Sequence, residues 1–274
     1  MENQPPKLGL IAGGGNLPKI LVRELQEKRD VFVIALIGDC EPETIENIPH
    51  EWVNIAAVGK ALNILKGNNI TEVVLAGSVK RPALSSLRPD FAGAKFLAKF
   101  LARKSQGDNA ILSAIINYLE ECGLRVAGAH ELLGNLLVGV GALGKIKPDA
   151  RVKKDIELAT RTLREIGKLD IGQAAIAQNG RIIGIEAVEG TDELIKRCAP
   201  YLRQDKGGVL VKIRKPGQDL RADLPTIGVG TVENIAAAGM AGIALEARSA
   251  LVLDKAEAIE SANRHGVFIF GIKQ

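Results

Sequence analysis

The sequence predicts an α/β protein, with an N-terminal Rossmann-like parallel sheet domain and a C-terminal α+β domain. Three observations carry this prediction. Short apolar runs alternate with amphipathic stretches in the first half, as is typical of a parallel sheet covered by helices on both faces. A glycine-rich segment without clear periodicity interrupts this pattern near residues 133–147. An Asn-Gly dipeptide between two apolar runs then indicates a β-hairpin.

The first half of the chain alternates expected strands with expected helices. The strands are expected at residues 8–12, 31–37, 72–76 and 124–127, and the helices at 18–28, 60–66, 91–104 and 109–121. The interruption near residue 133 sets a boundary between two domains, 1–133 and 134–274.

The second half begins with an expected helix and continues with antiparallel pairing. Helices are expected at residues 151–166, 191–202, 231–239 and 255–266, and strands on both sides of Asn179-Gly180 and at 207–215, 242–254 and 267–272. Thr191 or Asp192 is placed to cap its helix.

Composition and charge exclude several classes of protein. The 274 residues carry a net charge of +4 with acids and bases well mixed, which suits an anionic small molecule or membrane surface, is only weak evidence for nucleic acid, and is equally typical of an ordinary solvated surface. Three isolated cysteines, Cys40, Cys122 and Cys198, predict neither a disulfide framework nor a zinc site, and indicate a reducing cytoplasm. We expect no signal peptide, because the N-terminal stretch MENQPPKLGL is acidic and Pro-rich, and no transmembrane helix, because no uncharged apolar stretch of about 18 residues occurs.

The stretch LIAGGGNLP is the first candidate site. Gly13, Gly14 and Gly15 end an apolar run, and Pro18 suits the first turn of a helix. The free N–H groups at such a helix start favour a phosphate, although the glycines could simply form a tight turn. The dinucleotide fingerprint is only partly matched, because Pro18 stands where the third glycine is required.

A second glycine turn follows the strand expected at 72–76. Gly77 and Ser78 end that strand, and Lys80 and Arg81 follow. Ligands of parallel sheets bind beyond the carboxyl ends of the strands, so both turns are expected at one edge. Two basic residues there would suit a diphosphate, or would belong to an ordinary solvated loop.

The candidate catalysts are carboxylates and cations. The three histidines form no zinc pattern and no serine-hydrolase motif occurs, so any metal would take oxygen ligands, as Mg²⁺ or Mn²⁺ does. Glu186 and Glu189 lie near a Gly-Thr turn, and residues 212–223 form the densest polar stretch. Interleaved acids and cations suit metal-assisted phosphoryl transfer, and they also suit a surface loop.

Several segments together resemble a known family. In chain order they are LIAGGGNLP, GSVKRP, RPD, GDNAILSAI, VAGAHEL, LDIGQAAIAQNGRIIGIEAVEGTDELI, GGVLVKI and KPGQDLRADLPTIG. From Leu8 to Gly271 they are similar to the UDP-2,3-diacylglucosamine pyrophosphatases of lipid A biosynthesis that are unrelated to calcineurin-like phosphoesterases. The chain departs from the family pattern at Val229-Gly230, where an acid is common.

The resemblance implies a function and assigns a different part of the substrate to each domain. Family members hydrolyse UDP-2,3-diacylglucosamine, with Mg²⁺, to UMP and 2,3-diacylglucosamine 1-phosphate (lipid X). The N-terminal domain (1–133) would hold UDP and the C-terminal domain (134–274) lipid X. A cytoplasmic homodimer, peripheral to the inner membrane, is implied.

Site residues follow from the resemblance and from the motifs. The family's essential aspartate corresponds to Asp223, implied as the catalytic residue and as a ligand of Mg²⁺ or Mn²⁺. The expected substrate-binding residues are Gly13, Gly14, Gly15, Gly77, Ser78, Arg81, Gln173, Glu189, Thr191, Lys212, Lys215 and Thr226. Two other functions are retained as alternatives: an NAD(P)-dependent oxidoreductase, and a nucleotide- or lipid-binding protein without catalysis.

Overall fold

The computed structural model describes residues 5–80, 89–101, 108–203, 207–221 and 223–273. The chain forms two compact units. The first comprises Met1–Gly134 together with Asp219–Asp223, and the second comprises Asn135–Gln218 and Leu224–Gln274. The short segment Asp219–Asp223 therefore belongs with the N-terminal half, although the chain on either side of it belongs to the second unit.

The first unit contains a five-stranded, wholly parallel sheet in the order β3-β2-β1-β4-β5. Its strands are β1 (Leu8–Ala12), β2 (Val31–Leu36), β3 (His50–Val53), β4 (Glu72–Ala76) and β5 (Arg125–Ala127). β2 is buried along its whole length, which explains its uninterrupted run of Val, Ile, Leu, Phe and Ala. This parallel sheet confirms the Rossmann-like prediction.

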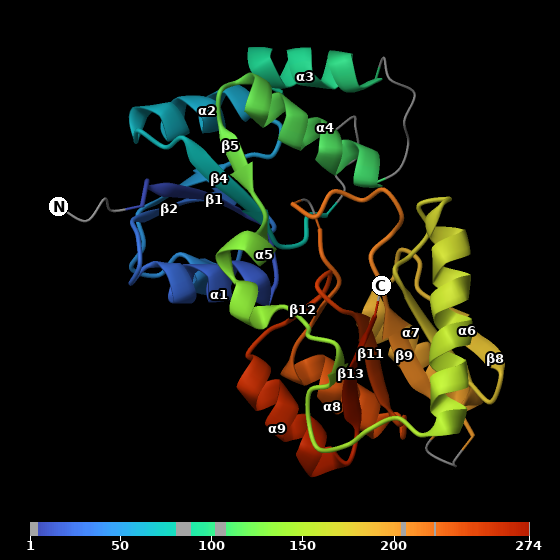
Figure 1. Cartoon of the computed structure of the whole chain (residues 1–274). Helices are drawn as coiled ribbons and strands as arrows, with labels where there is room; N and C mark the ends of the chain where they lie inside the picture. Colours follow the sequence, from blue (N-terminus) through green and yellow to red (C-terminus); the bar gives the residue numbers. More distant parts are fainter. Residues whose placement is uncertain (1–4, 81–88, 102–107, 204–206, 222, 274) are drawn as a thin grey trace. The chain divides into compact units, whose positions relative to one another are not determined.

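Helices cover both faces of this sheet. They are α1 (Asn16–Leu25), α2 (Val58–Gly67), α3 (Phe91–Leu101), α4 (Asp108–Glu121) and α5 (Ala129–Leu132). Figure 1 shows α1 and α5 on one face, and α2, α3 and α4 on the other. The core on the second face includes Leu65 of α2 and Ile116 of α4, packed against Ile34 and Val73 of the sheet. Helix α1 begins two residues before Pro18, so its expected start was slightly late.

The second unit contains a mixed six-stranded sheet in the order β6-β13-β11-β9-β7-β8. Its strands are β6 (Gly141–Ala142), β7 (Ala174–Gln178), β8 (Arg181–Ile185), β9 (Val209–Lys212), β11 (Gly242–Glu246) and β13 (Phe268–Ile272); β10 (Thr226–Ile227) and β12 (Leu251–Val252) form a separate parallel pair. The antiparallel pairing expected from the sequence is present at both ends of the sheet, whereas β9, β11 and β13 are parallel.

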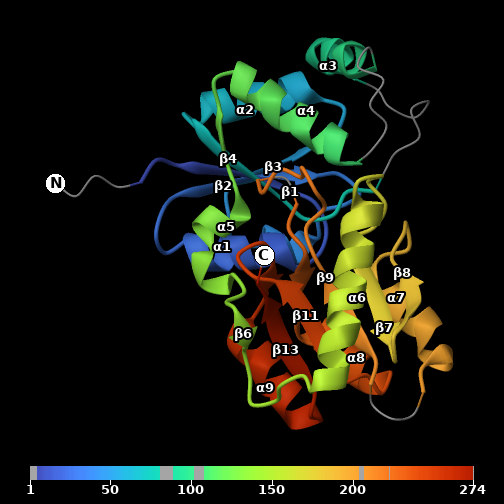
Figure 2. The same ribbon diagram turned by 45° about the vertical axis from the view of Figure 1, so that its right-hand side comes forward.

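Helices also cover this second sheet. They are α6 (Ala150–Gly167), α7 (Thr191–Cys198), α8 (Val229–Ala237) and α9 (Lys255–His265). Helix α6 packs on β7, β8 and β9, as Figure 2 shows, while side chains of α7, α8 and α9 form a separate core with the other face. The α+β prediction for this half is confirmed.

The β7–β8 hairpin forms where the sequence indicates it. Asn179 and Gly180 both have positive φ, 54° and 74°, as a two-residue type I′ turn requires. The buried Asp155 of α6 accepts hydrogen bonds from both turn N–H groups, at 2.9 and 2.6 Å. The turn and α6 together fix the hairpin, whose open end carries Gln173 and Glu186.

Candidate functional site

The two glycine turns of the first unit are bonded to each other. Gly14 and Ser78 exchange two backbone hydrogen bonds, of 2.8 and 2.9 Å, and the Gly13 N–H donates to Ala76. A Cβ atom on Gly13 would lie 2.3 Å from the Ser78 carbonyl oxygen, and one on Gly77 would lie 2.6 Å from that of Gly14. The glycines are therefore required for this close backbone approach at the carboxyl edge of the sheet.

These bonds also determine which N–H groups could bind a phosphate. The N–H groups of Gly13, Gly14 and Ser78 already donate to backbone carbonyls. Gly15, with φ of 88°, precedes α1 and donates its N–H to Glu41 Oε1 at 3.3 Å. A carboxylate of the protein itself thus lies at the start of α1, where a helix favours an anion.

Lys19 is the second group that binds the Glu41 carboxylate at the start of α1. Its ammonium pairs with Glu41 Oε2 at 2.7 Å. The pKa of the Glu41 carboxyl is lowered, first by the hydrogen bond from Lys19 and then by that from the Gly15 N–H. A phosphate arriving at α1 would compete with Glu41 for the same donors. Arg81, expected beside this edge, lies outside the described residues.

Pro18 separates this turn from the dinucleotide fingerprint. A Cβ atom on Gly77 would lie only 2.9 Å from Pro18 Cγ, so the proline ring packs against the second turn. The position of the third fingerprint glycine is thus occupied by a buried ring. This packing disfavours the oxidoreductase alternative, which rests on the glycines alone.

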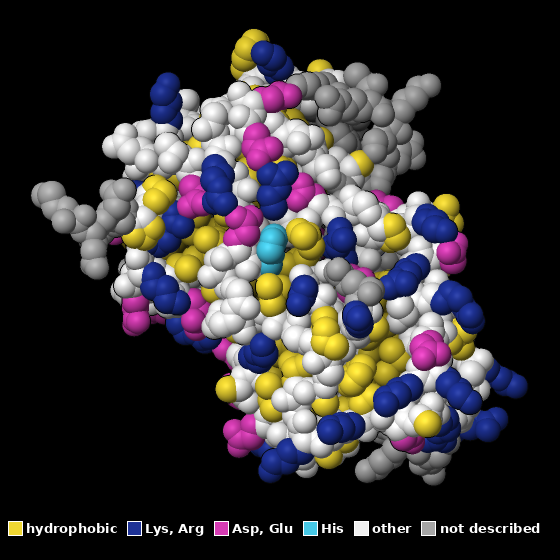
Figure 3. Space-filling model, viewed as in Figure 1, with side chains coloured by type: hydrophobic (Ala, Val, Ile, Leu, Met, Phe, Trp, Pro, Cys, Tyr) yellow, Lys and Arg dark blue, Asp and Glu magenta, His cyan; other side chains and the backbone are white. Residues whose placement is uncertain are grey.

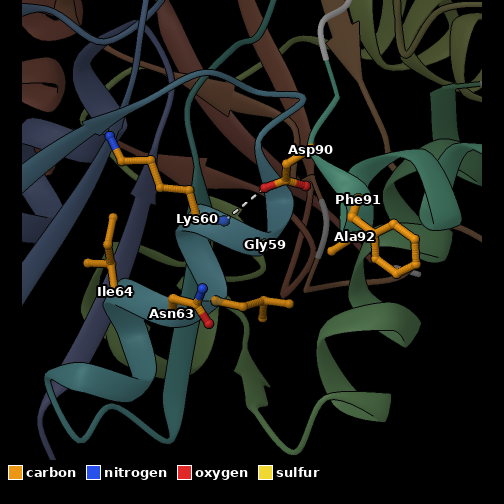
Figure 4. A pocket seen from close by; sticks show the side chains of 8 residues that line it. Gly59, Lys60, Asn63, Ile64, Asp90, Phe91 and Ala92 are labelled. Atoms are coloured by element: carbon orange, nitrogen blue, oxygen red, sulfur yellow. Dashed lines mark hydrogen bonds between the residues drawn. The ribbon is translucent and has the colours of Figure 1, made fainter.

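A cavity of about 760 Å³ lies between the starts of α2 and α3 (Figure 4). Asp90 at its edge caps both helices, because its carboxylate accepts hydrogen bonds from the N–H groups of Lys60 at 2.9 Å and Gly93 at 2.8 Å. Burial alone would raise the pKa of Asp90, but the backbone hydrogen bonds from Gly93, Lys60, Gly59 and Ala92 together outweigh it and lower the pKa. None of the residues expected to bind substrate lines this cavity.

The second unit brings four of the expected residues together at the carboxyl end of β9. The Lys212 ammonium donates to Thr191 Oγ1 at 2.9 Å and to the Thr226 carbonyl at 3.2 Å. Thr191 donates its hydroxyl to Glu186 Oε1 at 2.6 Å, and Glu186 Oε2 accepts from the Gln173 N–H at 3.2 Å. We call Gln173, Glu186, Thr191, Lys212 and Thr226 the lysine cluster.

Glu186 is the member of this cluster that the sequence-based site assignment missed. The sequence offered Glu186 and Glu189 on one turn, and the site assignment took Glu189. In the structure Glu189 pairs with Arg197 at 2.8 Å, outside the cluster. The predicted hairpin could have identified Glu186. This residue directly follows β8 and lies opposite Gln173 and Ala174 at the start of β7.

Lys215 also lies outside the lysine cluster. Its ammonium pairs with Asp170 Oδ1 at 2.7 Å, in the turn that follows α6. The turn residues Leu169 and Ile171 on either side of Asp170 are 73% and 46% exposed, and Val188, beyond Glu186, is fully exposed. These three apolar side chains form what we call the apolar rim of the carboxyl edge.

Asp223 is an exposed residue at the end of the segment Asp219–Asp223. Arg221 attaches this segment to α4, because its guanidinium pairs with Glu120 at 2.6 Å, and it also pairs with Asp219 of the segment itself at 2.8 Å. The hydrogen bond from Arg221 lowers the pKa of the Asp219 carboxyl. Arg221 thereby fixes the backbone two residues before Asp223.

Among the described residues, no group of three or more His, Cys, Asp or Glu side chains is placed to hold a metal ion. The exposed carboxylate of Asp223 nevertheless offers the oxygen chemistry that Mg²⁺ prefers. Protein sites often hold Mg²⁺ by one or two carboxylates, with substrate phosphates and water completing the coordination. The Asp223 carboxylate could therefore serve as one ligand of such an ion.

An apolar patch lies on the second unit beside α6 and is framed by Lys and Arg side chains (Figure 3). The core on this face of the sheet includes the partly buried Ile146, Phe270 and Ile272. Ala244 lies beside Phe270 on the neighbouring strand β11 and is fully buried. Such a patch fits hydrocarbon chains. None of the helices in the described ranges combines the length and apolarity of a membrane span.

Comparison with known proteins finds relatives along almost the whole chain. A family model described as the LpxI N-terminal domain matches residues 7–136, and one described as the LpxI C-terminal domain matches residues 139–270. The chain is 38% identical over 272 residues to the UDP-2,3-diacylglucosamine pyrophosphatase LpxI of Caulobacter vibrioides. The match covers 97% of each protein.

Proposed function

The chain belongs to the LpxI family, and on this premise we propose that it hydrolyses the diphosphate of UDP-2,3-diacylglucosamine in lipid A biosynthesis. The products are UMP and 2,3-diacylglucosamine 1-phosphate. The observation that carries the proposal is the end-to-end relationship with a named pyrophosphatase, across both family domains. A relationship confined to the glycine turns would support nucleotide binding alone.

We propose that the two units divide the substrate. The glycine turns at the carboxyl edge of the first sheet support nucleotide binding there. The second unit is assigned the diacylglucosamine 1-phosphate half, which needs both cationic and apolar surfaces. Lys212 supplies a buried cation, and the patch around Phe270 and Ile272 supplies the apolar surface.

Asp223 is the proposed catalytic carboxylate. Hydrolysis requires that a water oxygen bond to phosphorus while the bridging P–O bond breaks and the second phosphate departs. Asp223 would orient that water and accept its proton, or would hold Mg²⁺. When bound, Mg²⁺ or Mn²⁺ supplies Lewis-acid stabilisation of the phosphoryl oxygens. Lys212 would neutralise phosphate charge through its ammonium.

The pyrophosphatase assay tests both the activity and the role of Asp223. We expect UMP release from UDP-2,3-diacylglucosamine with Mg²⁺, and a loss of at least 100-fold in Asp223→Asn. Asp30→Asn, an exposed acid before β2, is the matched control and should keep full activity. No UMP release with any divalent metal would refute the proposed function. A higher Mg²⁺ requirement in Asp223→Asn would indicate metal binding, and a lower kcat at saturating Mg²⁺ would indicate water orientation.

Membrane association is the remaining part of the proposal. A diacylated substrate resides in a lipid bilayer, and the apolar rim of Leu169, Ile171 and Val188 lies beside the lysine cluster. We propose that this rim contacts the bilayer surface, as exposed apolar side chains of interfacial proteins do. Sedimentation with anionic vesicles should show weaker binding for the double variant Leu169→Asp/Val188→Asp than for Tyr201→Asp, an exposed apolar control elsewhere in the unit.

A further inference from the structure

The hydrogen bonds of the lysine cluster have a fixed direction. A lysine ammonium can only donate, so Thr191 Oγ1 must accept the 2.9 Å bond from Lys212. The single hydroxyl proton of Thr191 is then donated to Glu186 Oε1, at 2.6 Å. The order is therefore Lys212 to Thr191 to Glu186, with a buried cation at one end and a buried carboxylate at the other.

Both charged residues are removed from solvent. Lys212 is 5% exposed and Glu186 is 6% exposed. Burying two charges is unfavourable unless they compensate each other and their remaining polar atoms are bonded. Glu186 meets this condition, because its second oxygen accepts the Gln173 N–H. The hydroxyl between the two charges lets Glu186 compensate Lys212 without forming a direct ion pair.

This arrangement leaves binding capacity at the cluster. Within the described residues, Lys212 uses two of its three N–H groups, on Thr191 and on the Thr226 carbonyl. The side-chain oxygen of Gln173 is buried and has no hydrogen-bond partner in the same part of the chain. A phosphate oxygen could accept the third ammonium proton, and a sugar hydroxyl could donate to Gln173.

We propose that Glu186 is a positioning residue for Lys212 and acts through the Thr191 hydroxyl. This inference rests on the proposed function, in which Lys212 binds the phosphate of the diacylglucosamine half. Glu186 compensates the charge of the buried ammonium, and Thr191 fixes the direction of the ammonium so that one N–H stays available to substrate. A direct Glu186–Lys212 pair would instead turn that N–H toward the carboxylate.

Four variants test the relay. Thr191→Val keeps the shape and removes the hydroxyl, Thr191→Ser keeps the hydroxyl, Glu186→Gln removes the charge, and Lys212→Met removes the ammonium. Because a hydrogen bond to a charged group corresponds to about tenfold or more in equilibrium, we expect Thr191→Val and Glu186→Gln to lose at least about tenfold in kcat/KM. Thr191→Ser should restore activity to within about threefold of wild type.

The double variants separate positioning from a purely structural role. Once Lys212→Met has removed the ammonium, adding Thr191→Val or Glu186→Gln should cause little further loss in kcat/KM. Full additive losses would overturn the inference, as would normal activity in Thr191→Val. Thr162→Val, which removes a hydroxyl from α6, is the matched control, and thermal unfolding checks that each variant is folded.

A binding measurement keeps this inference distinct from the proposed activity. Calorimetry with 2,3-diacylglucosamine 1-phosphate should give the same non-additive pattern in Kd. If wild type releases no UMP but shows that pattern, the activity proposal fails and the relay stands. If wild type hydrolyses substrate while the losses are additive in both kcat/KM and Kd, the relay fails and the activity stands. Absence of binding by wild type would overturn the relay.

Discussion

Replacing Asp155 by Ala should destabilise the second unit through the turn of its hairpin. The Asp155 carboxylate is 1% exposed and accepts the N–H groups of Asn179 and Gly180, at 2.9 and 2.6 Å. A hydrogen bond to a charged group contributes about 1.5–3 kcal/mol. Because Gly180 is exposed, water can replace part of its bond, so the expected total loss is about 3 kcal/mol. Asp155→Asn, which keeps one acceptor oxygen, should lose about half as much.

Thermal and urea unfolding measure this loss. For a unit of this size about 3 kcal/mol corresponds to a fall in Tm of roughly 10 °C. Glu157→Ala, an exposed acid on the same helix, is the matched control and should change stability by less than about 0.5 kcal/mol. The open end of the hairpin carries Gln173 and Glu186, so Asp155→Ala should also lower kcat/KM below the unfolding temperature. A stability equal to that of the control would refute the turn-anchoring argument.

Three further predictions follow from other parts of the structure. Cys122 is exposed, whereas burial raises the pKa of the Cys40 and Cys198 thiols, so a thiol reagent at pH 7 should label Cys122 rapidly and the other two only on unfolding. Glu41→Ala should free the start of α1 and tighten UMP binding several-fold by calorimetry, and weaker binding would contradict competition at that site. The folded pKa of Asp219 is lowered by Arg221, so its stabilising effect exists above the unfolded pKa of about 3.9 and is lost as pH falls through the folded value. Arg221→Gln should therefore be less stable than wild type at pH 7, and the difference in unfolding free energy should shrink as the pH falls below the unfolded pKa and through the folded pKa of Asp219.

Elements with strong local signals could be predicted from the sequence. The buried strands of the first unit are continuous apolar runs, and the Asn179-Gly180 turn needs two positive φ values that these residues adopt readily. The parallel order of β9, β11 and β13 was missed, because it depends on crossovers through α8 and α9. The sequence of a short apolar strand does not indicate whether the neighbouring strands run parallel or antiparallel to it.

The sequence indicates members of the candidate site where they belong to a motif, but not where strand pairing brings them together. Glu186 and Glu189 are equivalent in the sequence, both lying near one Gly-Thr turn. The register of β7 and β8 places Glu186 against Gln173, while Glu189 lies far enough along the loop to meet Arg197. Glu41 at the start of α1 was missed for a similar reason, since 26 residues separate it from Gly15.

The polar stretch 212–223 shows that residues adjacent in the sequence need not belong to the same part of a site. Lys212 ends β9 and belongs to the second unit, whereas Asp219–Asp223 belongs to the first. Arg221 keeps Asp219–Asp223 with the first unit, because its bonds to Asp219 and Glu120 hold the backbone just before Asp223. The Lys212 ammonium in turn holds the Thr226 carbonyl, three residues after Asp223. The proposed catalytic carboxylate therefore follows directly after a backbone segment that Arg221 holds against α4, and losing the bond from Arg221 to Glu120 should lower kcat more than it weakens substrate binding.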